Sequence, residues 1–126
     1  MSSQLTPYIC VNDCRAAIDW YVTVLDAIVV VDPIVMDDGQ VGHCELAIDG
    51  ARWMMSGAFN TAGVAAPDPD RDPAVSLHLT VADVDAAAAR VAAAGSSLDR
   101  SPEDTPHGRI AVFRDPFGHR WMLNAA

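Results

Sequence analysis

An internal repeat constrains this chain more than any other feature of its sequence. Residues 8–17 read YICVNDCRAA and residues 78–87 read HLTVADVDAA, and the two stretches match at an offset of 70. Residues 50–55 (GARWMM) match residues 118–123 (GHRWML) at an offset of 68. Two matches in the same order and nearly in step indicate a duplication, so the two halves are expected to fold alike.

Each copy predicts one strand, one helix and three further strands. Residues 75–82 (VSLHLTVA) alternate apolar and polar side chains, as a half-buried strand does, and residues 5–11 are placed as its counterpart. Asp13 and Asp83 stand where a helix N-cap accepts hydrogen bonds, and Gly95 stands where the second helix should end. The remaining strands are expected at about 27–35, 41–49, 51–57, 96–101, 108–114 and 118–124.

The repeat predicts an α+β fold made of two tandem βαβββ modules. We expect a single domain, 1–126, with modules at about 1–57 and 75–126 and a linker rich in Ala, Gly, Pro and Asp at about 58–74. One helix covers only one face of a four-stranded sheet. The uncovered faces are therefore expected to curve together into an eight-stranded cleft.

Composition and charge narrow the classes of partner. The 126 residues are 51% hydrophobic, which is enough for a core, and the formal net charge is −9. A surface that acidic repels phosphate backbones and anionic lipids, so no nucleic-acid or membrane partner is expected. Neither a signal peptide nor an apolar run near the ~20 residues of a membrane span is seen, which predicts a cytoplasmic protein. The cysteines show no CxxC pair and are interpreted as small buried apolar side chains: Cys10, Cys14 and Cys44.

Strand alternation predicts which side chains face the cleft. In the third strand of the first copy, His43 and Glu45 alternate with apolar residues that should pack under the helix. In the first strand of the second copy, Ser76 and His78 take the same side. The pattern alone does not settle which face of the sheet the tryptophans of the repeated RWM tripeptide take. Aligning its tryptophans with the apolar positions puts them in the core and leaves in the cleft the two methionines, Met54 and Met122.

The repeated arginines, Arg52 and Arg120, allow two interpretations. They could bind an anionic ligand, or they could hold carboxylates across a sheet or a dimer interface. The sequence leaves this choice open.

Four stretches resemble the glyoxalase/bleomycin-resistance (vicinal oxygen chelate) superfamily, particularly its PhnB-like branch. They read TPYICVNDCRAAIDWYV, GHCELAIDG, VSLHLTVADVDAAAARVAAAG and DPFGHRWML, and together they span nearly the whole chain. The resemblance implies the two-module fold described above and commonly a homodimer.

The resemblance also implies where metal-using members would place their ligands. Those positions here are Thr6, Met54, Ser76 and Met122. Hydroxyl and thioether groups are poor ligands for a hard or borderline divalent ion, so no cofactor is predicted. A divalent metal at a relocated site made of His43, Glu45 and His78 is the alternative.

The leading hypothesis is a metal-free protein that sequesters an organic ligand in the inter-module cleft, as the bleomycin-resistance proteins it resembles do. The expected ligand-binding residues are His43, Glu45, Met54, Ser76, His78, Arg120 and Met122. The alternative is a metal-dependent or His-based lyase, isomerase or dioxygenase, with His78 and Glu45 as its catalytic acid–base pair. A third possibility is a regulatory subunit with a vestigial cleft. The sequence leaves open whether any reaction is catalysed.

Overall fold

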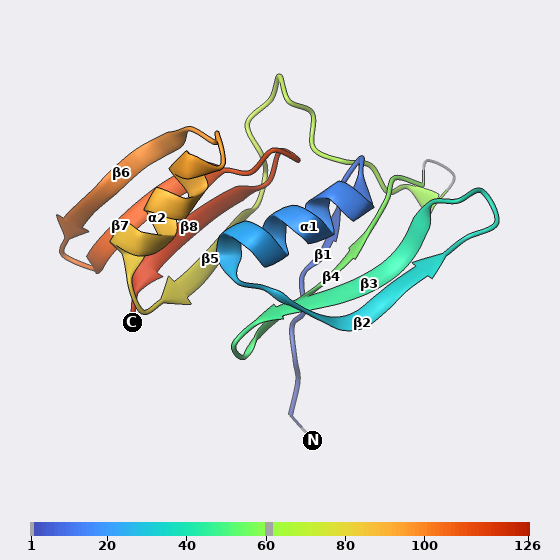
Figure 1. Cartoon of the computed structure of the whole chain (residues 1–126), viewed down its shortest axis with the longest axis horizontal. Coiled ribbons are helices and arrows are strands. Elements are labelled where there is room, and N and C mark those ends of the chain that lie inside the picture. Colours follow the sequence, from blue (N-terminus) through green and yellow to red (C-terminus); the bar gives the residue numbers. More distant parts are fainter. Residues whose placement is uncertain (1, 60–61) are drawn as a thin grey trace. The chain divides into compact units, whose positions relative to one another are not determined.

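The computed structural model describes residues 2–59 and 62–126, and Figure 1 shows its elements in chain order. The chain divides into two compact units, Met1–Ala66 and Pro67–Ala126. The first unit contains β1 (Tyr8–Cys10), α1 (Cys14–Leu25), β2 (Ile28–Val35), β3 (Val41–Ile48) and β4 (Ala51–Ser56). The second contains β5 (Ser76–Val81), α2 (Val84–Ala93), β6 (Leu98–Thr105), β7 (Gly108–Arg114) and β8 (Arg120–Ala125). Both units have the predicted βαβββ order.

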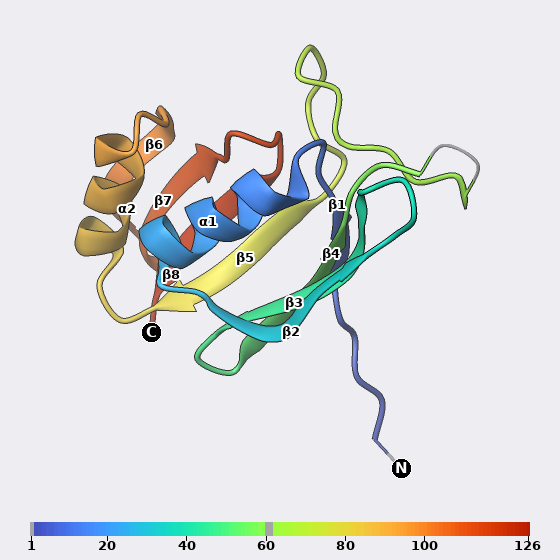
Figure 2. The same cartoon turned by 45° about the vertical axis from the view of Figure 1, so that its right-hand side comes forward.

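The two sheets have the same topology. Their strand orders are β1-β4-β3-β2 and β5-β8-β7-β6, with a parallel pair at β1/β4 and at β5/β8 and antiparallel pairs elsewhere. The register repeats too, because Tyr8 lies opposite Met54 and His78 lies opposite Met122. Helix α1 packs on β2 and β3, and α2 packs on β6, β7 and β8 (Figures 1 and 2). The α+β fold of two modules predicted from the repeat is confirmed.

Both helices begin at the predicted caps. The Asp13 carboxylate accepts from the Ala16 N–H at 3.1 Å, and the Asp83 carboxylate accepts from the Ala86 N–H at 3.0 Å. Helix α2 ends in a Schellman motif around Gly95, whose φ is +92°. No helix in the described residues is long and apolar enough to cross a membrane.

The core of each unit lies between its helix and its sheet. Tyr21 on α1 is fully buried and contacts Trp53 edge-on, with ring centroids 5.4 Å apart. In the second unit Trp121 is stacked on Phe113. The tryptophans of the repeated RWM tripeptide therefore face the core, as their alignment with the apolar positions predicted. The three cysteines are also buried.

The DPFG turn is held by a buried carboxylate. Asp115 is only 4% exposed and accepts hydrogen bonds from the Phe117 N–H at 2.9 Å and the His119 N–H at 3.0 Å. Its other oxygen accepts from the Trp121 indole N–H at 2.8 Å. The turn and the core tryptophan that follows it are thus fixed by one side chain.

Strand β6 is longer than the sequence predicted. It extends to Thr105 and includes Pro102, where a predicted strand normally stops. The strand lies at the sheet edge, and its pairing with β7 is irregular between Arg100 and Glu103. An edge strand tolerates Pro because the missing N–H is not needed on its open side.

Candidate functional site

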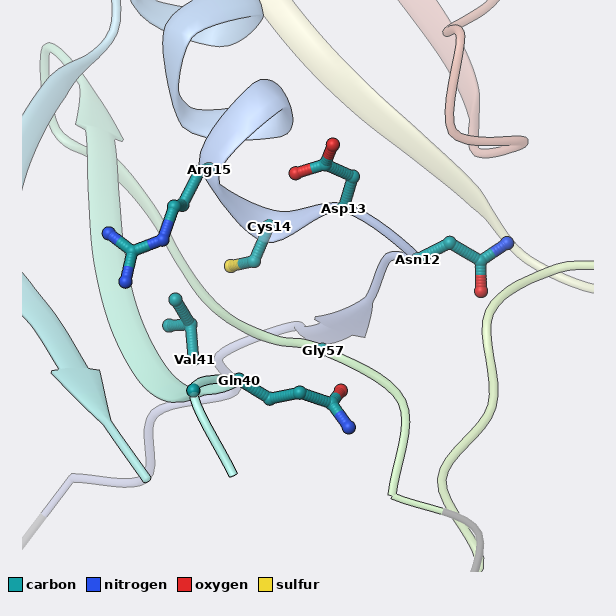
Figure 3. Close-up of a pocket in the computed structure, with 8 residues that line it drawn as sticks. Asn12, Asp13, Cys14, Arg15, Gln40, Val41 and Gly57 are labelled. Atoms are coloured by element: carbon teal, nitrogen blue, oxygen red, sulfur yellow. The ribbon is translucent and has the colours of Figure 1, made fainter. Parts of the chain in front are cut away.

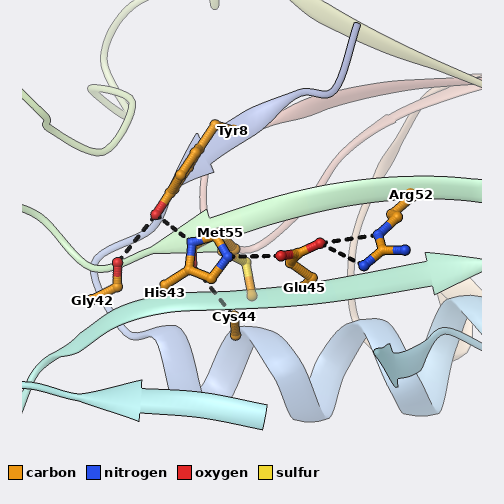
Figure 4. Close-up of polar contacts among 7 residues, drawn as sticks. All are labelled: Tyr8, Gly42, His43, Cys44, Glu45, Arg52 and Met55. Carbon is orange, nitrogen blue, oxygen red and sulfur yellow. Dashed lines mark hydrogen bonds and ion pairs between the residues drawn. The ribbon is translucent and has the colours of Figure 1, made fainter. Parts of the chain in front are cut away.

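A row of polar side chains crosses the helix-free face of the first sheet (Figure 4). Tyr8 comes from β1, His43 and Glu45 from β3, and Arg52 from β4. Their opposite-facing neighbours on the same strands are fully buried under α1, among them Cys44. Alternation along β3 therefore places His43 and Glu45 on the helix-free side, as predicted.

The row is a continuous hydrogen-bonded chain. Tyr8 Oη lies 2.7 Å from His43 Nδ1 and 3.1 Å from the Gly42 carbonyl oxygen. His43 Nε2 lies 2.9 Å from Glu45 Oε2. The Arg52 Nε and Nη2 atoms donate to Glu45 Oε1 at 3.0 and 2.8 Å. Every side chain in the row is thus held by at least one neighbour before any ligand arrives.

The geometry of this hydrogen-bonded row suits both the neutral and the protonated form of His43, with no movement of heavy atoms. When His43 is neutral, its Nε2–H donates to Glu45 and its Nδ1 accepts from the Tyr8 hydroxyl. When His43 is protonated, both ring nitrogens donate, and the Tyr8 hydroxyl hydrogen turns to the Gly42 carbonyl. In both states every side chain of the row is hydrogen-bonded.

The charges in the row are arranged around Glu45. Hydrogen bonds from His43 and then from Arg52 hold the pKa of Glu45 below its usual range, so this carboxylate is ionised near neutral pH. Partial burial, followed by the nearby thiols of Cys44 and Cys14, raises the pKa of Tyr8. The phenol therefore stays protonated and serves as a hydrogen-bond donor and acceptor rather than as an anion.

Met54 completes the face in the first unit. It lies opposite both Tyr8 and Glu45 in the sheet register, and its side chain is half-buried. The Tyr8 residue is 52% exposed, so its ring is accessible from solvent. The face thus combines an aromatic ring, a flexible thioether and oriented polar atoms.

The second unit presents a different set of residues on the equivalent face. Ser76 and His78 are exposed on β5, and Arg120 and Met122 lie opposite them on β8. Arg120 Nη1 donates to Ser76 Oγ at 2.8 Å. The structure thus brings Ser76 and Arg120 into contact, whereas Glu45, the proposed acid–base partner of His78, is hydrogen-bonded to His43 and Arg52.

The residues at the superfamily's metal positions do not fit a divalent ion. Ser76 Oγ accepts from the Arg120 guanidinium, and a cation at that distance opposes a second cation. Thr6, Met54 and Met122 offer only hydroxyl or thioether groups. Within residues 2–59 and 62–126, no three His, Cys, Asp or Glu side chains gather as a metal site would require.

A separate hollow of about 250 Å³ lies at the N-terminal end of α1 (Figure 3). Its lining includes Asn12, Cys14, Arg15 and Gln40, together with Asp13, whose carboxylate already caps the helix. None of the site residues predicted from the sequence lines it.

Two residues of these faces were not identified from the sequence. Tyr8 lies directly before the apolar core of β1, and its register opposite Met54 becomes visible only once β1 pairs with β4. Arg114 ends β7 and lies opposite Arg120. Both positions depend on which strands pair, and a single sequence does not contain that information.

Comparisons with known proteins place the chain in a family. Residues 4–123 match the family model described as Glyoxalase/Bleomycin resistance protein/Dioxygenase superfamily. The protein Mb0911c of Mycobacterium bovis is 37% identical over 123 residues, which cover 94% of this chain and 80% of that protein.

Solved structures agree on the fold. TnmS3, an antibiotic binding protein from Streptomyces sp. CB03234, is 26% identical with a TM-score of 0.68, over 99% of this chain and 98% of that one. The PhnB protein from Bacillus cereus has a TM-score of 0.74 at 18% identity, over 98% of this chain and 100% of that one. On the family match and the shared two-module fold, the chain belongs to the glyoxalase/bleomycin resistance protein/dioxygenase superfamily.

Proposed function

We propose that this protein binds a small organic molecule, without a metal, on the sheet faces that its helices leave uncovered. The observation that carries the proposal is the hydrogen-bonded row from Tyr8 to Arg52 beside Met54. Binding usually costs free energy because side chains lose rotamer freedom. A row already held by its own hydrogen bonds avoids much of that cost.

The chemistry of the row suits a ligand with both apolar and polar parts. The exposed ring of Tyr8 and the thioether of Met54 offer an adaptable apolar surface. The Tyr8 hydroxyl and the His43 ring offer a donor or an acceptor, depending on where the proton lies. The antibiotic-binding relative TnmS3 supports the general class of ligand, a small organic molecule.

The donor sets support binding without a metal. Glu45 already binds Arg52 and His43, and Ser76 binds Arg120. A divalent ion at Glu45 Oε1 or at Ser76 Oγ would lie beside a guanidinium that already donates to that oxygen, and the two positive charges would repel each other. We also propose, from the resemblance alone, a homodimer of the PhnB-like branch in the cytoplasm.

The test is a thermal-unfolding screen of the purified protein without a His tag, against a library of organic compounds and against Zn²⁺, Ni²⁺, Mn²⁺ and Fe²⁺. An organic ligand at 100 times its Kd should add about 2.7 kcal/mol to the free energy of unfolding. His43→Ala should weaken that ligand, whereas the surface variant Arg71→Ala should not. Stabilisation by a divalent ion, with no effect from any organic compound, would contradict the proposal.

An enzymatic function is the second candidate, and one contact favours it. The His43–Glu45 hydrogen bond of 2.9 Å is the arrangement that orients an imidazole for proton transfer. We propose that His43, oriented by its hydrogen bond to Glu45, is the acid–base group of a lyase, isomerase or dioxygenase reaction. The pairing of His78 with Glu45, expected from the sequence, is the other acid–base assignment that we propose. Unchanged turnover of an identified substrate after both His43→Gln and His78→Gln would exclude acid–base catalysis by either histidine.

A further inference from the structure

Two arginines lie directly opposite each other at one end of the second sheet. Arg114 ends β7, Arg120 begins β8, and the two are register partners. Like charges at directly opposed positions destabilise a sheet unless something compensates for them. The same two residues line a cavity of about 360 Å³, together with Asp72, Pro73, Ser76 and Asp99.

Neither guanidinium is neutralised by the part of the chain that the structure describes. Arg114 donates from Nε to the Gly118 carbonyl at 2.9 Å and from Nη2 to the Asp68 carbonyl at 3.1 Å. Arg120 donates from Nη1 to the Ser76 hydroxyl. All three acceptors are uncharged. A guanidinium has five N–H donors, so each arginine is fixed in place and keeps donors to spare.

The two carboxylates that line the cavity do not neutralise the arginines either. Asp72 and Asp99 are exposed, and within the described residues no ion pair joins either of them to Arg114 or Arg120. Because they line the same cavity, they lower its positive potential and make it unfavourable for an anion of high charge.

In the first copy of the repeat, a carboxylate neutralises the equivalent arginine. Arg52 is the counterpart of Arg120, but it lies opposite Ala47 rather than a second arginine. Glu45, opposite Met54, binds Arg52 through two nitrogen atoms. In the second copy the residue opposite Met122 is Val112. The second copy thus has an apolar residue where the first has Glu45, and an arginine where the first has Ala47.

We propose that the Arg114–Arg120 cavity binds the carboxylate group of a small organic ligand. This inference rests on the proposed function and deepens it, because it names the charged group that the ligand carries. A planar carboxylate matches the fork of donors on a guanidinium, and a single negative charge suits a cavity that Asp72 and Asp99 also line. The rest of the ligand would lie along the same face toward His78 and Met122.

The experiment uses three benzene-ring probes of different charge: anionic benzoate, neutral benzamide and cationic benzylamine. Each is titrated into the full chain at low millimolar to tens of millimolar concentration, and the arginine Nε–H resonances are followed by NMR. We expect saturable shifts of Arg114 and Arg120 with benzoate, and at least tenfold weaker binding of benzamide and benzylamine.

Variants then locate the binding. Arg120→Gln should weaken benzoate about tenfold or more, and Arg120→Lys should weaken it less, because the charge stays and the fork is lost. Arg114→Gln should act like Arg120→Gln, with its fold checked by thermal unfolding. Arg109→Gln is the matched control. It removes an arginine of the same unit that is already paired with Asp85 and Asp104, and it should leave benzoate binding unchanged.

The outcomes separate this inference from the proposed function. Equal binding of all three probes, or benzoate binding that survives both Arg114→Gln and Arg120→Gln, would overturn the carboxylate site and leave organic-ligand binding standing. The absence of binding by benzoate and by every compound of the organic library would overturn both.

Discussion

At the residue scale, Glu45 and Asp115 are two carboxylates that organise their surroundings in different ways. Glu45 lies on an open face and is held by a histidine and an arginine. Asp115 is buried and is held by two backbone N–H groups and an indole. The first arrangement leaves oriented polar atoms toward solvent, and the second builds a turn.

The Glu45 ion pairs should make stability depend on pH. A carboxyl group whose pKa is lowered in the folded state stabilises the protein above its unfolded pKa, and this stabilisation is lost as the pH falls through the folded value. The unfolded reference for Glu is 4.5. The melting temperature of the wild type should therefore exceed that of Glu45→Gln at pH 6, and the difference should shrink below about pH 4.5. Glu103→Gln, which breaks an exposed ion pair with Arg100, controls for the change in net charge. A difference that stays constant from pH 6 to pH 3 would contradict this prediction.

Replacing Asp115 should be costly because three donors would lose their acceptor in a buried place. Asp115→Ala leaves two backbone N–H groups and the Trp121 indole without their acceptor. We expect a loss of about 2–4 kcal/mol in the free energy of unfolding, measured by urea denaturation. Asp70→Ala, on an exposed segment, should change it by less than about 0.5 kcal/mol. A loss below about 1 kcal/mol for Asp115→Ala would show that water replaces the carboxylate.

At the element scale, the sequence predicted strands and helices well where local chemistry decides them. The caps Asp13 and Asp83 and the terminator Gly95 act through hydrogen bonds and dihedral angles within a few residues, so a single sequence contains the information. Strand β6 was predicted too short because Pro102 is a local stop signal, whereas its tolerance depends on the strand's position at the sheet edge. The site residues, too, were predicted where local pattern decides their position. Alternation placed His43 and Glu45 on the helix-free face, but the contacts of Tyr8 and Arg114 depend on which strands pair.

The end of α2 gives a prediction at this scale. Gly95 has a φ of +92°, which residues with a Cβ rarely adopt, and no atom would contact an added Cβ there. Gly95→Ala should therefore lower the free energy of unfolding by about 1 kcal/mol through backbone strain alone. Gly50→Ala is the matched control, because Gly50 also has open space around a Cβ but no positive φ. Equal effects of the two substitutions, measured by urea denaturation, would refute this explanation.

At the scale of the whole molecule, duplication explains both the regular fold and the uneven chemistry. The residues that face the helices are kept similar in the two copies, as the paired tryptophans Trp53 and Trp121 show, because each core must be filled. On the helix-free faces the two copies differ, because Glu45 corresponds to the buried Val112 and the buried Ala47 corresponds to Arg114. A repeat therefore predicts the architecture of the chain, whereas the functional differences lie where the copies diverge.

The net charge of −9 gives the last prediction, which concerns the whole chain rather than any one contact. Excess negative charge repels itself in the compact state, and salt screens that repulsion. Raising NaCl from 10 to 200 mM at pH 7 should increase the free energy of unfolding by roughly 1 kcal/mol, or about 4 °C in melting temperature. Near pH 4.5, the isoelectric point, the same salt change should have little effect or a small destabilising one, because only the attractive ion pairs remain to be screened. Equal stabilisation at both pH values would mean that salt acts through the hydrophobic core instead of through net charge.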